Sequence, residues 1–163
     1  MLMDLDKAHY VVITGIVVKD GKYLITKRAS HEKAFPNLWT VPGGKLEVSD
    51  YSNRKKDTSD HWYNICEDVL RREVKEETNL EIENIRYLTS LTFIRPDNIP
   101  VVVISLYADY KGGEIKLCKD MQGYALVSLG EAKDYDLIAG IYEELEMLDR
   151  KLKGENIELW RKF

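Results

Sequence analysis

Three glutamates that fall within one short segment have the clearest potential for chemistry in this sequence. Glu73, Glu76 and Glu77 are related by i,i+3 and i,i+4 spacings, so on a helix their carboxylates project from one side. Like charges at such spacings repel, at a cost of about 0.3 kcal/mol per pair. A hard divalent cation such as Mg²⁺ removes this repulsion and keeps coordination sites for water and phosphate. The spacing favours a metal site, and the alternative is a solvated acidic face in which Arg72 pairs with Glu76.

The turn Pro42-Gly43-Gly44-Lys45 lies upstream of the acidic segment. Two consecutive glycines allow the backbone to approach a metal or a phosphate closely. Glu47 follows this turn, Arg28 closes a predicted strand, and Asp120 lies in a loop farther along the chain. We therefore expect three loops to converge on the acidic helix.

Apolar periodicity predicts a mixed α/β chain that positions these residues. The predicted strands are residues 9–18, 22–28, 39–41, 85–94, 101–110, 114–118 and 124–127. The predicted helices are residues 60–78, which carry the acidic segment, and 136–153, in which Glu144 is expected to face solvent. Residues 48–60 are polar and have no apolar period, so we expect a flexible surface insertion there.

The bulk properties of the chain indicate one globular domain, residues 1–163, with 44% hydrophobic and 32% charged residues. A net charge of -4 gives no general attraction to nucleic acid or anionic lipid, which favours a small-molecule ligand. We expect no membrane span, two reduced cysteines and a cytoplasmic location. The histidines His9, His31 and His61 are isolated in the sequence, and each is expected to be structural or exposed.

Residues 43–47 and 72–80 together resemble the Nudix box, whose pattern is G-x5-E-x7-R-E-U-x-E-E-x-G-U with U an aliphatic residue. Residues 72–77 reproduce its R-E-U-x-E-E segment letter for letter. Residues 37–44 are similar to the strand and loop that lead into the box in this family, and the likeness extends over nearly the whole chain. The resemblance implies an α/β fold, specifically a Nudix-like α/β/α sandwich with a mixed β-sheet.

The chain departs from the box at two places. The last glycine of the pattern is Asn79, a residue that also suits a left-handed helix end. Gly44 and Arg72 are 28 positions apart instead of 14, and the excess of 14 coincides with the polar insertion. The first glutamate of the box is therefore unassigned, and its candidates are Asn64, Glu47 and Glu67.

The resemblance implies roles for particular residues. The implied ligands of Mg²⁺ or Mn²⁺ are the Gly44 carbonyl, Glu73, Glu76 and Glu77. The implied catalytic residues are Glu76, Glu77, Arg72, which orients a carboxylate, and Asp120, as a general base or a ligand of a second metal. The implied substrate contacts are Arg28, Trp39 and Lys45, although core packing is the favoured alternative for Trp39.

The implied reaction is metal-dependent hydrolysis of the diphosphate linkage in a nucleoside diphosphate derivative, which gives a nucleoside monophosphate. The candidate substrates are a nucleoside triphosphate, ADP-ribose and a nucleotide sugar. Two alternatives stay open: a non-catalytic Nudix-like module that senses a nucleotide, and isomerisation of isopentenyl diphosphate. The isomerase needs a catalytic cysteine, and neither Cys66 nor Cys118 lies in a recognisable motif. A homodimer is one assembly that we consider.

Overall fold

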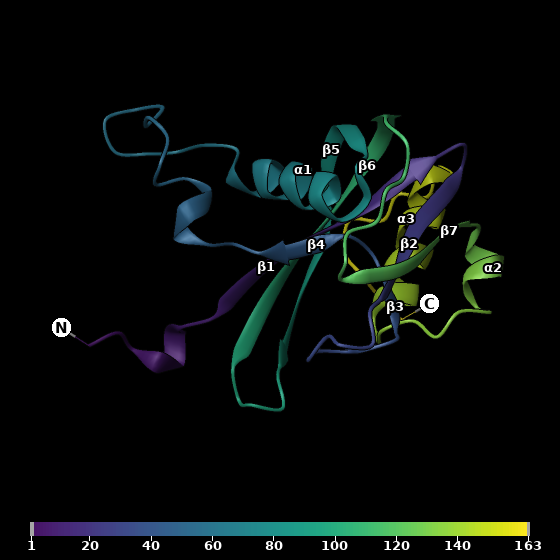
Figure 1. Ribbon diagram of the computed structural model, residues 1–163, viewed down its shortest axis with the longest axis horizontal. Helices are drawn as coiled ribbons and strands as arrows, with labels where there is room; N and C mark the ends of the chain where they lie inside the picture. Colours follow the sequence, from purple (N-terminus) through teal and green to yellow (C-terminus); the bar gives the residue numbers. More distant parts are fainter. Residues whose placement is uncertain (1, 163) are drawn as a thin grey trace.

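A mixed sheet with helices on both sides is the frame of the protein, whose computed structural model describes residues 2–162 (Figure 1). Its strands are β1 (Tyr10–Lys19), β2 (Lys22–Arg28), β3 (Trp39–Thr40), β4 (Gly43–Lys45), β5 (Glu81–Ile94), β6 (Pro100–Gly112) and β7 (Met121–Val127). Its α-helices are α1 (Ile65–Thr78), α2 (Leu129–Ala132) and α3 (Ile141–Leu152), and its 3-10 helices are η1 (Leu5–Lys7) and η2 (Val48–Asp50). None of the helices in this described part of the chain combines the length and the apolar character needed to cross a bilayer.

Strand β1 occupies the centre of the sheet and changes partners along its length. It runs parallel to β6 and antiparallel to β2 and β4. Val18 of β1 pairs with Tyr23 at the β2 end, and Ile13 pairs with Gly44 at the β4 end. The strand order is β3-β2-β1-β6-β5, with β7 added to β2. The two glycines of β4 are thus built into the sheet beside its central strand.

The strands predicted at residues 9–18 and 22–28 are present as β1 and β2, which form an antiparallel hairpin. Asp20 and Gly21 form its two-residue turn, with φ of 51° and 74°. Two successive residues with positive φ match the twist of the flanking strands, and a glycine adopts this conformation without strain.

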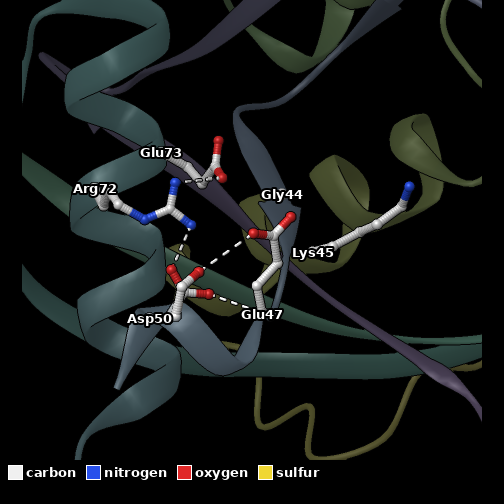
Figure 2. A pocket seen from close by; sticks show the side chains of 7 residues that line it. Gly44, Lys45, Glu47, Asp50, Arg72 and Glu73 are labelled. Carbon is white, nitrogen blue, oxygen red and sulfur yellow. Dashed lines mark hydrogen bonds and ion pairs between the residues drawn. The ribbon is translucent and has the colours of Figure 1, made fainter. Parts of the chain in front are cut away.

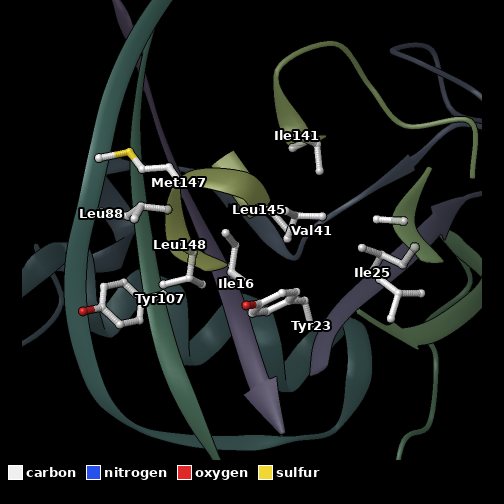
Figure 3. Packing of buried hydrophobic residues seen from close by; sticks show 12 residues of the cluster. Ile16, Tyr23, Ile25, Val41, Leu88, Tyr107, Ile141, Leu145, Met147 and Leu148 are labelled. Carbon is white, nitrogen blue, oxygen red and sulfur yellow. The ribbon is translucent and has the colours of Figure 1, made fainter. Parts of the chain in front are cut away.

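Two apolar layers on opposite faces of the sheet confirm the predicted α/β/α sandwich. Alternate β1 residues separate into them, because successive side chains of a strand point to opposite faces. Ile13 and Val17 pack with Leu70 of α1, whereas Ile16 packs with Leu145 of α3. Figure 3 shows the second layer, in which α3 covers residues of β1, β2, β5 and β6.

Both long helices begin later than the sequence pattern predicts. Helix α1 starts at Ile65 and not near residue 60, because Asn64 is left-handed with φ of 59° and interrupts the helix. Helix α3 starts at Ile141 and not at residue 136. The preceding segment extends along β3, where the Trp39 amide donates to the Asp136 carbonyl over 2.9 Å.

Residues 114–118 do not form the predicted strand. Their amides instead serve the C-terminal end of α1, where helix carbonyls lack intrahelical partners. The Lys116 amide donates to the Thr78 carbonyl over 3.0 Å, and the Cys118 amide donates to the Glu77 carbonyl over 3.1 Å. The segment therefore hydrogen-bonds to the end of the acidic helix and does not add a strand to the sheet.

The polar segment before α1 lies on the surface, as predicted, but it has internal contacts of its own. Figure 1 shows it as a blue loop that extends away from the sheet beside α1. The Arg54 guanidinium donates to the Tyr63 carbonyl over 2.8 Å, and the Trp62 indole donates to the Arg54 carbonyl over 3.0 Å. The rings of Tyr51 and Trp62 lie 5.2 Å apart. These contacts fold residues 51–64 back on themselves, so that the loop leaves and rejoins the protein beside α1.

Candidate functional site

The acidic side of α1 lies directly against the glycine strand β4. A Cβ atom built on Gly44 would overlap the carboxylate of Glu73, and one built on Gly43 would overlap the Ile13 carbonyl. Glycine is therefore required at Gly43, where the obstacle is backbone, whereas a Cβ at Gly44 would force the Glu73 side chain to move. The close approach brings the Gly44 backbone and the Glu73 carboxylate into one site.

Arg72 joins three carboxylates of this site. Its Nη1 lies 2.9 Å from Glu73 Oε1 and 3.1 Å from Glu76 Oε2, and its Nη2 lies 2.8 Å from Asp50 Oδ1. Figure 2 shows the guanidinium of Arg72 between Glu73 and Asp50. The orienting role that the resemblance implies for Arg72 thus has a geometric basis, and it extends to a residue outside the acidic helix.

Asp50 is a site residue that the sequence analysis missed. Its side chain is only 8% exposed, and it accepts the Glu47 amide over 2.7 Å while it pairs with Arg72. Counting six positions forward from Gly44, as G-x5-E prescribes, reaches Asp50. Counting eight positions back from Arg72 passes through the additional residues and reaches Asn64 instead.

Asp50 resolves the missing first carboxylate of the box. None of the three candidates pairs with Arg72 among the described residues: Asn64 precedes α1 as its N-cap, Glu67 lies in its first turn, and Glu47 donates its amide to Asp50. Between Asp50 and Arg72 lie 21 residues, where the pattern has seven. The extra 14 residues equal in number the folded-back loop at 51–64, which overlaps the polar segment 48–60.

Glu77 is more enclosed than Glu73 and Glu76, the other two acidic residues of the segment. Its Oε2 is buried and has no hydrogen-bond partner among the described residues. Burial and the charge of Glu73 raise the pKa of Glu77 to about 8, against the opposing effects of the Gly43 amide and of Arg28. A buried carboxylate oxygen without a partner is costly unless a proton or a cation joins it.

Glu73 and Glu76 differ from Glu77 in exposure. The Glu73 side chain is 15% exposed, and burial raises its pKa although Arg72 opposes the change. The Glu76 side chain is 59% exposed. The exposure of the carboxylates to solvent thus increases from Glu77 to Glu73 to Glu76. Glu73 also borders a cavity of about 480 Å³. Its lining residues are Gly44, Lys45, Glu47, Ser49, Asp50, Arg72 and Glu73.

The predicted substrate contacts lie in different surroundings. Lys45 borders the cavity, and its ammonium lies 5.3 Å from the centre of the Tyr10 ring. Arg28 donates to Glu32 over 2.9 Å and to the Ala34 carbonyl over 2.7 Å, near enough to Glu77 to lower its pKa. The Arg28 charge is thus available at the inner end of the acidic group.

Trp39 packs as a structural residue. Its ring meets the Tyr135 ring edge-on at 4.8 Å, and it borders the apolar layer under α3. The alternative of core packing, which the sequence analysis favoured, describes these contacts.

Asp120 has His31 as its side-chain hydrogen-bond partner. Its carboxylate lies 3.0 Å from His31 Nε2, and this hydrogen bond lowers the pKa of Asp120. The segment before Asp120 reaches α1 at the bonds from the Lys116 amide to the Thr78 carbonyl and from the Cys118 amide to the Glu77 carbonyl. His31 is exposed, as expected from the sequence, and a residue 89 positions away lies beside it.

Comparisons with known proteins agree with this architecture. The NUDIX domain family model matches residues 9–146. The NAD-capped RNA hydrolase NudC of Vibrio atlanticus (strain LGP32) is 28% identical over 139 residues, a match that covers 80% of this chain and 44% of that protein. This chain therefore spans less than half the length of that relative.

A second relative and a solved structure have a more similar length. The nucleoside triphosphatase NudI of Escherichia coli (strain K12) is 24% identical over 137 residues, covering 77% of this chain and 86% of that protein. The crystal structure of a MutT NUDIX hydrolase from Burkholderia pseudomallei superposes with a TM-score of 0.69 at 20% identity, covering 87% of this chain and 99% of that one. At this level of identity, the superposition shows a shared fold.

Proposed function

This chain belongs to the Nudix family of pyrophosphohydrolases, and we propose that it hydrolyses the diphosphate linkage of a nucleoside diphosphate derivative with the help of Mg²⁺ or Mn²⁺. One observation carries the proposal. The buried Oε2 of Glu77 has no partner among the described residues, and Glu73 and Glu76 stand beside it on the same side of α1. This arrangement is costly for the fold and suited to a divalent cation.

The donor set fits a hard cation. The proposed ligands are all oxygen atoms: the carboxylates of Glu73, Glu76 and Glu77 and the carbonyl of Gly44. The absence of a Cβ at Gly44 leaves the Glu73 carboxylate room to lie against the strand. Oxygen ligands favour Mg²⁺ and Mn²⁺ over softer metals. When bound, such a cation would neutralise charge on the diphosphate and lower the pKa of a bound water.

The protein's own groups would keep these carboxylates in place. Arg72 fixes Glu73 and Glu76 through its two short ion pairs, and Asp50 holds Arg72 from the opposite side. The Gly43 amide hydrogen-bonds the Glu77 carboxylate. We propose that Glu76 and Glu77 are the box carboxylates that take part in activating water, with the proton passing to a carboxylate oxygen.

Cationic side chains flank the acidic group and would meet the phosphates. We propose that Arg28, near Glu77, and Lys45, at the border of the cavity, contact substrate oxygens. Asp120 remains a proposed general base or second-metal ligand, although its observed partner is His31. Base stacking on Trp39 would need the ring to remain partly accessible, and Trp39 is only half-buried.

A small nucleotide is the proposed substrate class. A nucleoside triphosphate is the first candidate, because the relative named as a nucleoside triphosphatase matches this chain over 86% of its own length. ADP-ribose and nucleotide sugars share the diphosphate linkage and stay in the proposal. A cytoplasmic location and a single domain over the whole chain also remain proposals.

The alternative functions find less support in the structure. A nucleotide-sensing module would be favoured if the first carboxylate of the box were missing, whereas Asp50 offers a carboxylate that pairs with Arg72. Isopentenyl diphosphate isomerisation would require a cysteine in the pocket. Cys66 packs beside the apolar layer under α1, and neither it nor Cys118 borders the cavity.

A substrate panel tests the proposal. Nucleoside triphosphates, ADP-ribose and nucleotide sugars are incubated with Mg²⁺ or Mn²⁺, and phosphorus NMR identifies the products. We expect release of a nucleoside monophosphate that needs the metal and falls at least ~100-fold in Glu77→Gln. Glu67→Gln, on the same helix but away from the cavity, serves as the matched control and should retain activity. Absence of turnover, together with nucleotide binding measured by calorimetry, would favour the sensing module.

A further inference from the structure

A second group of metal-binding side chains lies next to the box but shares no residue with it. His31 and Glu32 belong to the loop after β2, and Asp120 belongs to the loop before β7. One ligand atom from each of the three lies within 4.8 Å of the others. Ligand atoms bound to one ion at about 2.1 Å are roughly 3.5 Å apart. Small side-chain rotations would therefore bring all three onto one ion.

The two loops that carry this cluster are fixed to one another. The Ala29 amide donates to the Asp120 carbonyl over 2.9 Å. The Gln122 side-chain amide donates to the Arg28 carbonyl over 3.0 Å and to Asn37 Oδ1 over 2.8 Å. The three side chains are thus held together by bonds between the loops that do not depend on their own charges.

The charges within the cluster are incompletely balanced. Arg28 engages Glu32 through Oε2 at 2.9 Å, so the other carboxylate oxygen of Glu32 is left for a further partner. Asp120 interacts with both His31 and Glu32. Two carboxylates beside one imidazole, with the nearby Arg28 charge already paired with Glu32, are an arrangement that a divalent cation stabilises.

The chemistry of the ligands differs from that of the box. An imidazole nitrogen with two carboxylates suits a transition metal of the Zn²⁺ type, whereas an all-oxygen set suits Mg²⁺. We propose that His31, Glu32 and Asp120 form a site for a divalent transition metal outside the box, with Zn²⁺ as its best-suited ion and one coordination position open to solvent, so that Asp120 serves as a metal ligand and not as the general base. The exposure of His31 and Asp120, at 59% and 43%, leaves such a site accessible from bulk water.

A calorimetric titration with Zn²⁺ in millimolar Mg²⁺ tests this site. The Mg²⁺ occupies the oxygen ligands of the box and competes weakly for an imidazole. We expect one Zn²⁺ per chain, bound ~10–100-fold more weakly by His31→Ala and by Asp120→Asn. His61→Ala is the matched control, because His61 contacts Thr58 in the folded-back loop and should leave the affinity unchanged.

A second measurement identifies the ligand directly. In imidazole-detected NMR, Zn²⁺ should move the resonances of His31 and leave those of His9 and His61 in place. The proposal is overturned if His31→Ala binds Zn²⁺ as tightly as the unmodified chain, or if no Zn²⁺ binds in the presence of Mg²⁺. It is also overturned if Glu73→Gln abolishes Zn²⁺ binding while the two cluster variants do not, since the ion would then belong to the box. These readouts need no turnover, so they are independent of the proposed hydrolysis.

Discussion

Two glutamates that each bury a carboxylate oxygen, one on each side of the sheet, show how the same side chain can serve different ends. Glu77 lies on α1, and Glu144 lies on α3. Each has a buried carboxylate oxygen without a partner among the described residues. Burial is the main cause that raises the pKa of Glu77 to about 8 and that of Glu144 to about 7.

The surroundings of the two residues are what differ. Glu77 stands among further carboxylates, beside a glycine strand and near the charge of Arg28. Glu144 follows the buried side of α3, and its polar neighbours are the Ser105 hydroxyl, which lowers its pKa, and Glu143, which raises it. A raised pKa alone therefore does not identify a site. A buried carboxylate indicates metal chemistry where other ligands converge on it, and otherwise it makes the packing sensitive to pH.

The largest expected effect on activity comes from disturbing the close approach between Gly44 and the Glu73 carboxylate. Gly44→Ala would push the added methyl group into Glu73 and displace the proposed ligands by a fraction of an ångström or more. We expect a fall in kcat/KM of about 100-fold, since a displacement of roughly 1 Å has that effect in an active site. Gly112→Ala is the control, because a Cβ there meets no neighbouring atom. Activity close to that of the unmodified protein in Gly44→Ala would contradict the proposed geometry.

The second prediction concerns Glu144, whose effect on the free energy of unfolding should depend on pH. A carboxyl whose pKa is raised in the folded state favours its protonated form. Its contribution to stability is therefore complete below the ordinary value of 4.5 and is lost as pH rises to about 7. Glu144→Gln should raise the free energy of unfolding by about 2 kcal/mol at alkaline pH and little at acidic pH.

Urea unfolding at acidic and alkaline pH measures this difference, with Mg²⁺ present and absent. The gain from Glu144→Gln should be independent of Mg²⁺, because none of the proposed metal ligands is among the groups that affect the pKa of Glu144. Glu143→Gln, an exposed change on the same helix, is the control. A gain that is the same at both pH values would refute the assignment of Glu144 as the titrating group.

The smallest expected effect on activity concerns Asp50, which would position the acidic residues through Arg72. Asp50→Asn would remove the ion pair at 2.8 Å and leave Arg72 to be held only by Glu73 and Glu76. We expect kcat to fall about 10-fold with little change in KM, the effect of a residue that positions another. Asp50→Glu, which restores the residue of the family pattern, should retain most activity. An Asp50→Asn enzyme that is impaired only in KM would point to a role in substrate binding instead.

Features that depend on neighbouring residues were predictable from the sequence. The i,i+3 and i,i+4 spacing of the acidic residues placed them on one side of a helix, and Asn79 ends that helix with φ of 64°. The turn at Asp20 and Gly21 is equally local. The family could also be predicted from the sequence, because the R-E-U-x-E-E segment is continuous and intact.

The tertiary structure alone decided how distant segments meet. Asp50 reaches Arg72 across an insertion that no periodicity can bridge, and His31 reaches Asp120 across 89 positions. Residues 114–118 alternate like a strand but are drawn to the carbonyls at the end of α1. Glu144 was wrongly expected to face solvent, because the buried face of α3 is wider than the apolar stripe that marks it. Apolar patterning determines which elements form, whereas the partners of polar side chains depend on packing between elements.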